Sequence, residues 1–190
     1  RELKYMFTEA IKLIKGKEYA SATAKLQPLT SSDDAETAAK ANYLLGYINT
    51  RWDYKEKNLS LTERCLYSKL NGLYPHPLAY VLYADVTEDV NVATNYLNKG
   101  IRRFPDDPRI YEKLLQKTAN KDSVVDEIRE KGLSDPQLLG AVISYLIADQ
   151  QWDKIPRFLF RVRKDNELND WENAYLKLIE ANVYLFCKTP

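Results

Sequence analysis

A helix-start signal that recurs at nearly constant spacing is the strongest constraint on the fold of this chain. Pro77, Pro108 and Pro136 stand 31 and 28 residues apart, and each follows a residue able to cap free backbone N–H groups. Proline suits the first helical position, where its missing N–H has no intrahelical partner to lose. A period of this size is typical of stacked helix-turn-helix repeats. The spacing therefore predicts helix pairs, each burying on the next the apolar surface that it cannot cover alone.

Helical periodicity and end signals divide the chain into helices. The clearest pattern lies in residues 136–149, where apolar residues recur at spacings of one, three and four. Further signals are capping-box pairs and terminal glycines: Asp33 with Glu36, Asn169 with Glu172, Gly72 and Gly132. We expect helices near 2–15, 18–30, 35–51, 58–71, 77–87, 90–104, 108–119, 122–131, 136–149, 153–164 and 170–187. No strand-length alternation competes with them, so the sequence predicts an all-α fold.

The composition is that of a globular chain without a strong overall charge. Hydrophobic residues make up 45%, and 28 basic against 27 acidic side chains leave a net charge of +1. Such a balance favours neither nucleic acid nor anionic lipid as a partner of the whole surface. No apolar run approaches the roughly 18 residues that span a bilayer, so we expect no membrane span.

The compartment and the limits of the natural chain stay open at this stage. Cys65 and Cys187 lie far apart and form no CxxC pair, so the redox environment is undecided. A cytoplasmic location of the protein is a first expectation. The chain opens at Arg1 without a methionine, which allows for a processed or excised piece. We therefore expect one helical-repeat domain over residues 1–190, either whole or a fragment of a longer protein.

Short motifs within the helix pairs resemble the tetratricopeptide repeat family. That family places a Leu-Gly or Leu-Ala pair on helix A, an aromatic residue followed by Ala on helix B, and a small residue before a closing Pro. The matching residues here are Leu45-Gly46, Tyr19 and Ala22, and Ala93, Tyr96, Leu97, Gly100 and Pro105. Trp152 with Ile155 forms a degenerate copy, and residues 108–135 carry almost none of the signature.

The resemblance implies a particular architecture. We expect a right-handed α-α superhelix of about five stacked helix-turn-helix repeats plus a C-terminal helix. A related helical-repeat family is the alternative.

Residues able to carry catalysis are few. His76 is the only histidine and lies between Pro75 and Pro77, where turn formation and capping explain it. Pairing it with Cys65 as base and nucleophile would need a third, orienting group that the sequence does not indicate. Neither GxxxxGK[ST] nor GxGxxG occurs. We expect no enzyme, no catalytic residue, no cofactor and no metal site.

The resemblance implies a concave groove, lined by successive A helices, that takes a peptide or helix from a partner. The positions that would line it are Lys40, Tyr43, Tyr47 and Arg51, then Val81, Asp85 and Glu88, then Arg109, Glu112 and Gln116. For Tyr43, Tyr47 and Val81 the alternative is packing between repeats. The Lys, Asn and Arg clamp by which some members bind acidic C-terminal tails is incomplete here. The predicted function is a noncatalytic interaction scaffold, adaptor or sensor module that binds a protein or peptide.

Four basic side chains share one face of the helix predicted at 153–164: Lys154, Arg157, Arg161 and Lys164. This face suggests a nucleic-acid-associated helical repeat as the alternative function. The competing interpretation is a solvated outer face, favoured by nearby Asp153, Asp165 and Glu167. Since nucleic-acid binding usually needs several convergent basic contacts, we expect a protein partner rather than nucleic acid.

The last predicted helix is apolar around most of its circumference. Its apolar residues are Trp171, Tyr175, Leu176, Leu178, Ile179, Val183, Tyr184, Leu185 and Phe186. A helix that is apolar all round is usually covered by other elements on more than one side. We expect further repeats, a second copy of the chain or another protein to cover it, or else the helix to fold back into the final groove.

Overall fold

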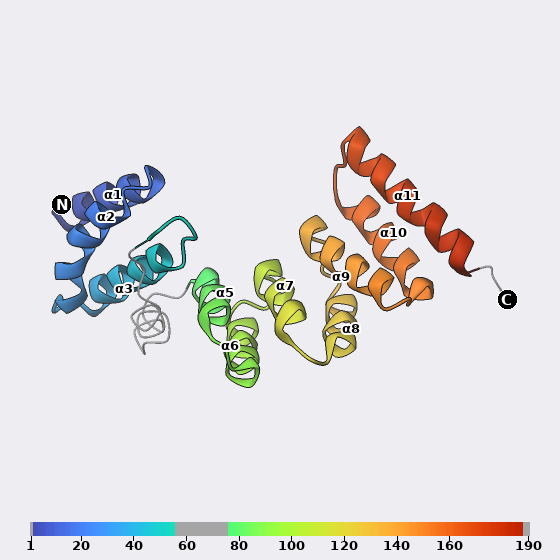
Figure 1. The fold of residues 1–190 in the computed structure, drawn as a ribbon, viewed down its shortest axis with the longest axis horizontal. Coiled ribbons are helices and arrows are strands. Elements are labelled where there is room, and N and C mark those ends of the chain that lie inside the picture. The colour runs from blue at the N-terminus through green and yellow to red at the C-terminus, as the bar shows by residue number, and fades with distance from the viewer. Residues whose placement is uncertain (1, 56–75, 188–190) are drawn as a thin grey trace. The chain divides into compact units, whose positions relative to one another are not determined.

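A computed structural model describes residues 2–55 and 76–187 and divides into two compact units, residues 1–105 and 106–190 (Figure 1). Every regular element in the described ranges is helical, which confirms the all-α prediction there. The boundary follows Pro105, the residue predicted to close a repeat. The right-handed superhelix, the repeat family and the single domain remain predictions.

The first unit begins with three helices around one apolar core. Helix α1 (Glu2–Lys15) packs against α2 (Tyr19–Leu26), and α2, continued by a 3₁₀ turn (Gln27–Ser31), packs against α3 (Ala35–Asn49). Their shared core is built mainly of small and aliphatic side chains with two aromatic rings: Phe7, Ala10, Tyr19, Ala22, Leu26, Leu29, Ala41, Leu45 and Ile48. The helix predicted at 58–71 and its terminal Gly72 lie outside the described residues.

The remainder of this unit is a helix pair joined by aromatic packing. Helix α5 (Pro77–Val86) packs against α3 and against α6 (Val90–Arg103). Four tyrosines form the centre of the cluster: Tyr43, Tyr80, Tyr83 and Tyr96. A Cβ built on Gly100 would lie 2.8 Å from Cγ of Tyr80, so only glycine allows α6 to approach α5 this closely. Gly100 therefore marks a close approach of the two helices.

The second unit contains five α-helices in its described part: α7 (Pro108–Lys117), α8 (Lys121–Lys131), α9 (Pro136–Ala148), α10 (Ile155–Asp165) and α11 (Asp170–Cys187). A short 3₁₀ turn, η3 (Trp152–Lys154), precedes α10. Helix α7 packs against α8 and α9, and α10 packs against both α9 and α11. The apolar stripe predicted on α9 is buried, as expected: Leu138, Leu139, Val142, Ile143 and Leu146.

Capping side chains explain where most of the helices begin. His76, Asp107 and Asp135 each accept a hydrogen bond from a backbone N–H of the helix that follows, at 3.2, 3.0 and 3.0 Å. Asn169 and Glu172 form the predicted reciprocal capping box, with both distances 2.8 Å. For α3 the predicted capping residue, Asp33, was wrong by one position.

At α3 the capping residue is Asp34 rather than Asp33. Its carboxylate accepts hydrogen bonds from the backbone N–H of Thr37 at 2.9 Å and from the Thr37 hydroxyl, which together lower the pKa of Asp34. Gly132, a predicted terminal glycine, ends α8 in a left-handed conformation, with φ 69°.

Candidate functional site

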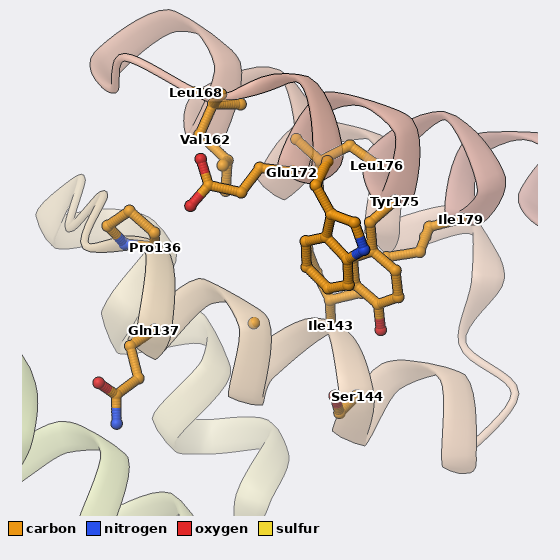
Figure 2. Close-up of a pocket in the computed structure, with 12 residues that line it drawn as sticks. Pro136, Gln137, Ile143, Ser144, Val162, Leu168, Glu172, Tyr175, Leu176 and Ile179 are labelled. Carbon is orange, nitrogen blue, oxygen red and sulfur yellow. The ribbon is translucent and has the colours of Figure 1, made fainter.

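A groove of 440 Å³ opens between α9 and α11 in the second unit (Figure 2). Helix α9 contributes one wall through Pro136, Gly140 and Ser144, which recur every four residues and so share one face. The opposite wall comes from α11, and Figure 2 shows Tyr175 pointing from that helix toward Ile143 and Ser144. The groove therefore lies between α9 and α11, which are separated in sequence by α10.

Two stacked aromatic rings form the α11 wall. The rings of Trp171 and Tyr175 are one helical turn apart, with centroids separated by 5.6 Å and planes inclined by 3°. Trp171 is 73% exposed and Tyr175 is 49% exposed. Aromatic side chains of this kind combine large apolar area with a polar tip and are enriched in binding surfaces. The stack thus presents a preformed apolar surface to solvent.

Gly140 leaves the α9 wall open. It lies in the middle of α9, and a Cβ built on it would meet no atom within 4 Å. Glycine in a helix interior is less favourable than alanine by about 1 kcal/mol. Neither packing nor a left-handed backbone requires glycine here, in contrast to Gly100 and Gly132. Because this position has no side chain, an approaching group can reach the helix backbone.

Acidic side chains gather in sequence at the start of α11. Residues 165–176 contain Asp165, Glu167, Asp170 and Glu172 and no Lys or Arg. Of these, Glu172 lines the groove, and one of its oxygens accepts the capping hydrogen bond from the backbone N–H of Asn169. The helix dipole places roughly half a positive charge at this end, and Lys164 directly precedes the stretch, so the four carboxylates leave a net negative charge in this part of the sequence.

The groove residues predicted on α3 and just after it are largely engaged within the first unit. Tyr43 is 6% exposed and stacks on His76 with centroids 4.6 Å apart, which agrees with the packing alternative. Lys40 Nζ lies 4.6 Å from the ring centroid of Phe7. The Arg51 guanidinium lies 4.2 Å from the ring centroid of Tyr47 and donates to its hydroxyl oxygen at 3.3 Å. These side chains stabilise their own helix and its neighbours.

The other predicted groove residues divide between the two units. In the first unit, Val81 is half-buried on α5, Asp85 is exposed near its end, and Glu88 is exposed beyond it. In the second unit, α7 carries the remaining three, which are Arg109, Glu112 and Gln116.

Those three side chains on α7 contact polar neighbours. Arg109 makes two hydrogen bonds to the Asp107 carboxylate, at 3.1 and 2.7 Å, and Gln116 accepts from Lys113 at 2.9 Å. Glu112 accepts from Gln137 at 3.4 Å. Since Gln137 lines the groove, Glu112 is the predicted site residue that the structure brings next to it.

The four predicted basic-face residues do not act as one surface. Arg161 turns to α8 and donates to the backbone oxygens of Ile128, Arg129 and Leu133 at 3.4, 3.1 and 3.3 Å. Lys154 donates to Gln151, while Arg157 and Lys164 are exposed. The nucleic-acid alternative stays a prediction, with fewer convergent cations than the sequence suggested.

Arg157 and Lys154 also line a hollow of 250 Å³ with residues from α8. Asp126 and Asp153 lie in the same hollow, and Arg129 forms an ion pair with Asp126 at 3.4 Å. Its charge is therefore mixed, which gives a nucleic acid no consistent electrostatic attraction.

A second apolar hollow, of 580 Å³, lies between α10 and α11 and includes Phe160 and Tyr184. Arg163 and Glu180 join the two helices at its edge through two hydrogen bonds, at 3.3 and 3.0 Å. The hydrogen bond from Arg163, followed by its charge, lowers the pKa of Glu180. This hollow belongs to a contact that the two helices already make.

The outer side of α11 is exposed as well. Leu176, Ile179 and Val183 are buried, whereas Leu178, Tyr184, Leu185 and Phe186 are exposed. Phe186 nevertheless stacks on Trp152, with centroids 4.6 Å apart. The observation supports the premise that this helix needs further cover, and what covers it remains a prediction.

Sequence reasoning missed the α9 wall of the groove. An isolated glycine in a strongly helical pattern was the available signal at Gly140. The sequence marks Trp171 and Tyr175 as apolar residues of the last helix but does not indicate a site there. Among the described residues, no cluster of His, Cys, Asp and Glu is suited to hold a metal ion, and no helix is long and apolar enough to cross a membrane.

Comparison of the chain with protein-family models, with curated proteins and with solved structures finds no match.

Proposed function

We propose that this protein is a noncatalytic interaction module that binds a short segment of another protein in the groove between α9 and α11. The observation that carries the proposal is the exposed Trp171–Tyr175 stack facing a wall kept open by Gly140. Binding energy in interfaces concentrates in aromatic anchors of this type, provided that they become desolvated by a well-fitting partner. The rings are already stacked, so less conformational entropy is lost on binding.

The dimensions of the groove suit a peptide segment. Its volume of 440 Å³ lies in the range of roughly 300–1,000 Å³ that clefts for small ligands have. A groove of this size takes a few side chains of a partner rather than a folded domain. A role as scaffold, adaptor or sensor in a larger assembly is consistent with this form of binding.

The position of the groove agrees with the resemblance to tetratricopeptide repeats. Helix α10 lies between α9 and α11 in sequence and packs on both, as a B helix between two successive A helices would. The family binds its partners along that side. The repeat arrangement itself is part of the proposal.

Selection from a random peptide library displayed on phage, with the whole chain as bait, tests this function. Recovered peptides are synthesised with a fluorescent label, and their affinities are measured by anisotropy. Gly140→Leu should weaken them at least about tenfold, since a leucine there projects into the groove. It should also fold normally, because no atom lies within 4 Å of the new Cβ and leucine favours helix.

Trp52→Ala is the matched control, since Trp52 is exposed and belongs to the first unit. It should leave the affinities unchanged. Peptides that bind wild type and Gly140→Leu equally well, or a selection that yields no binder, would contradict the proposal.

A further inference from the structure

The carboxylates at the start of α11 form no ion pair, unlike two others of the same unit. Asp107 is bound by Arg109 and Glu180 by Arg163. Among the described residues, neither Asp170 nor Glu172 forms an ion pair with a Lys or Arg. Asp165 and Glu167, which precede them, are exposed and likewise form none. Residues 164–176 therefore carry four carboxylates against one lysine, which gives the start of α11 a net negative charge.

Trp171 lies between two of these carboxylates in sequence and attracts the same kind of group. A tryptophan ring binds a Lys or Arg cation through its negative face, with the strongest effect where water is displaced. This chain already uses such contacts: the Arg51 guanidinium lies over Tyr47, and Lys40 lies over Phe7. At Trp171 the ring is 73% exposed and the neighbouring charges are negative.

We infer that the occupant of the groove is a basic segment of another protein, in which Lys or Arg flanks the apolar residues that fill the groove. The inference rests on the proposed function and specifies the partner's chemistry. The apolar residues would pack between Gly140 and the Trp171–Tyr175 stack. The flanking cations would lie over the indole ring and near Asp170 and Glu172. An acidic segment would be repelled by the same net charge.

Three labelled twelve-residue peptides test this charge preference by fluorescence anisotropy. They share the core Leu-Pro-Pro-Leu and carry on each side Arg-Gly-Arg-Gly, Ser-Gly-Ser-Gly or Glu-Gly-Glu-Gly. The Arg-flanked peptide should bind about tenfold more tightly than the Glu-flanked one, since several exposed charge pairs each contribute modestly. The Ser-flanked peptide should lie between them, and added salt should reduce the difference.

The double variant Asp170→Asn/Glu172→Gln should reduce the preference for Arg-flanked over Glu-flanked peptide to about threefold or less. Glutamine also serves in a capping box, so α11 should keep its start. Its matched control is Glu130→Gln/Asp153→Asn, which neutralises two exposed carboxylates of the same unit that do not line the groove. The control should keep the full preference.

The possible results separate this inference from the proposed function. Equal affinity for Arg- and Glu-flanked peptides, with both lost in Gly140→Leu, would overturn the inference and leave the proposed function standing. No binding of the Arg-flanked peptide would also overturn the inference, and the phage selection then decides the proposed function separately. Arg-flanked binding that persists in Gly140→Leu would overturn both.

Discussion

The α5–α6 pair of the first unit and the α9–α11 groove of the second combine glycine and aromatic rings to opposite effect. On α6, Gly100 lies under the ring of Tyr80, which is 7% exposed. On α9, Gly140 faces open space, across a groove from the exposed Trp171. Glycine permits close approach in both places. In the first unit a ring of the same protein makes that approach, and in the second the position is left open.

The surrounding aromatic contacts sharpen this difference. In the first unit, Tyr96 contacts both Tyr80 and Tyr83, with ring centroids 4.8 and 4.4 Å apart, and all three rings are buried. In the second unit, Trp171 and Tyr175 stack only along their own helix surface. Aromatic area that folding has buried stabilises the fold, whereas exposed area is available to a partner.

Gly100→Leu should have the largest effect on stability. Its new Cβ would lie 2.8 Å from Cγ of Tyr80, so α5 and α6 must separate, with a loss of about 3 kcal/mol in the free energy of unfolding. Urea denaturation followed by circular dichroism measures the loss. Hydrogen exchange should place it in the first unit.

The partner substitution provides the control for Gly100. Combining Gly100→Ala with Tyr80→Ala removes the ring that the new methyl group would meet, so the two changes should be less harmful together than the sum of each alone. Simple additivity would show that Tyr80 is not the reason for glycine at this position.

Arg161→Ala should have the next largest effect, now in the second unit. The guanidinium donates to three backbone oxygens at the end of α8, and losing these charge-assisted hydrogen bonds should reduce the free energy of unfolding by about 2 kcal/mol. Arg157→Ala, at an exposed position on the same helix, should change it by less than about 0.5 kcal/mol. Equal effects of the two would indicate that Arg161 is an ordinary surface residue.

Local rules predicted the helical content and most of the helix starts in the described residues, because these rules act within a few residues. Proline at the first helical position and a capping side chain at Asp107 and Asp135 placed two helix starts correctly. The error at Asp33 was one residue, since adjacent aspartates offer the same chemistry and only the backbone decides which of them caps. Gly132 ended α8 as its type predicts.

The site could not be predicted in this way, because contacts distant in sequence decide it. Arg161 belongs by spacing to a basic face, yet it reaches a helix end 32 residues earlier in the chain. The sequence allows Tyr43 in either groove or core, and its stacking on His76 agrees with the core. Gly100 and Gly140 both lie within helices, and the contact each makes with the facing helix cannot be predicted from its neighbours in sequence.

Gly140→Ala should produce a smaller change of the opposite sign. The methyl group meets no atom within 4 Å, so better helix propensity should raise the free energy of unfolding by about 1 kcal/mol. The same methyl group should weaken groove peptides, which gives greater stability with poorer binding. Thermal denaturation and anisotropy on one preparation measure both. A stabilised variant with unchanged peptide affinity would mean that Gly140 does not contact the partner.

Trp171→Ala should have the smallest effect on stability. It tests whether the exposed ring in the α9–α11 groove serves binding rather than folding. The ring is 73% exposed and contacts Tyr175 on its own helix, so the free energy of unfolding should change by less than about 0.5 kcal/mol. Peptide affinity should nevertheless fall at least about tenfold, because truncating an aromatic anchor typically removes more than 1 kcal/mol of binding energy. Loss of both stability and binding would instead make Trp171 part of the core, as Tyr80 is, and the groove would then be a feature of folding rather than of recognition.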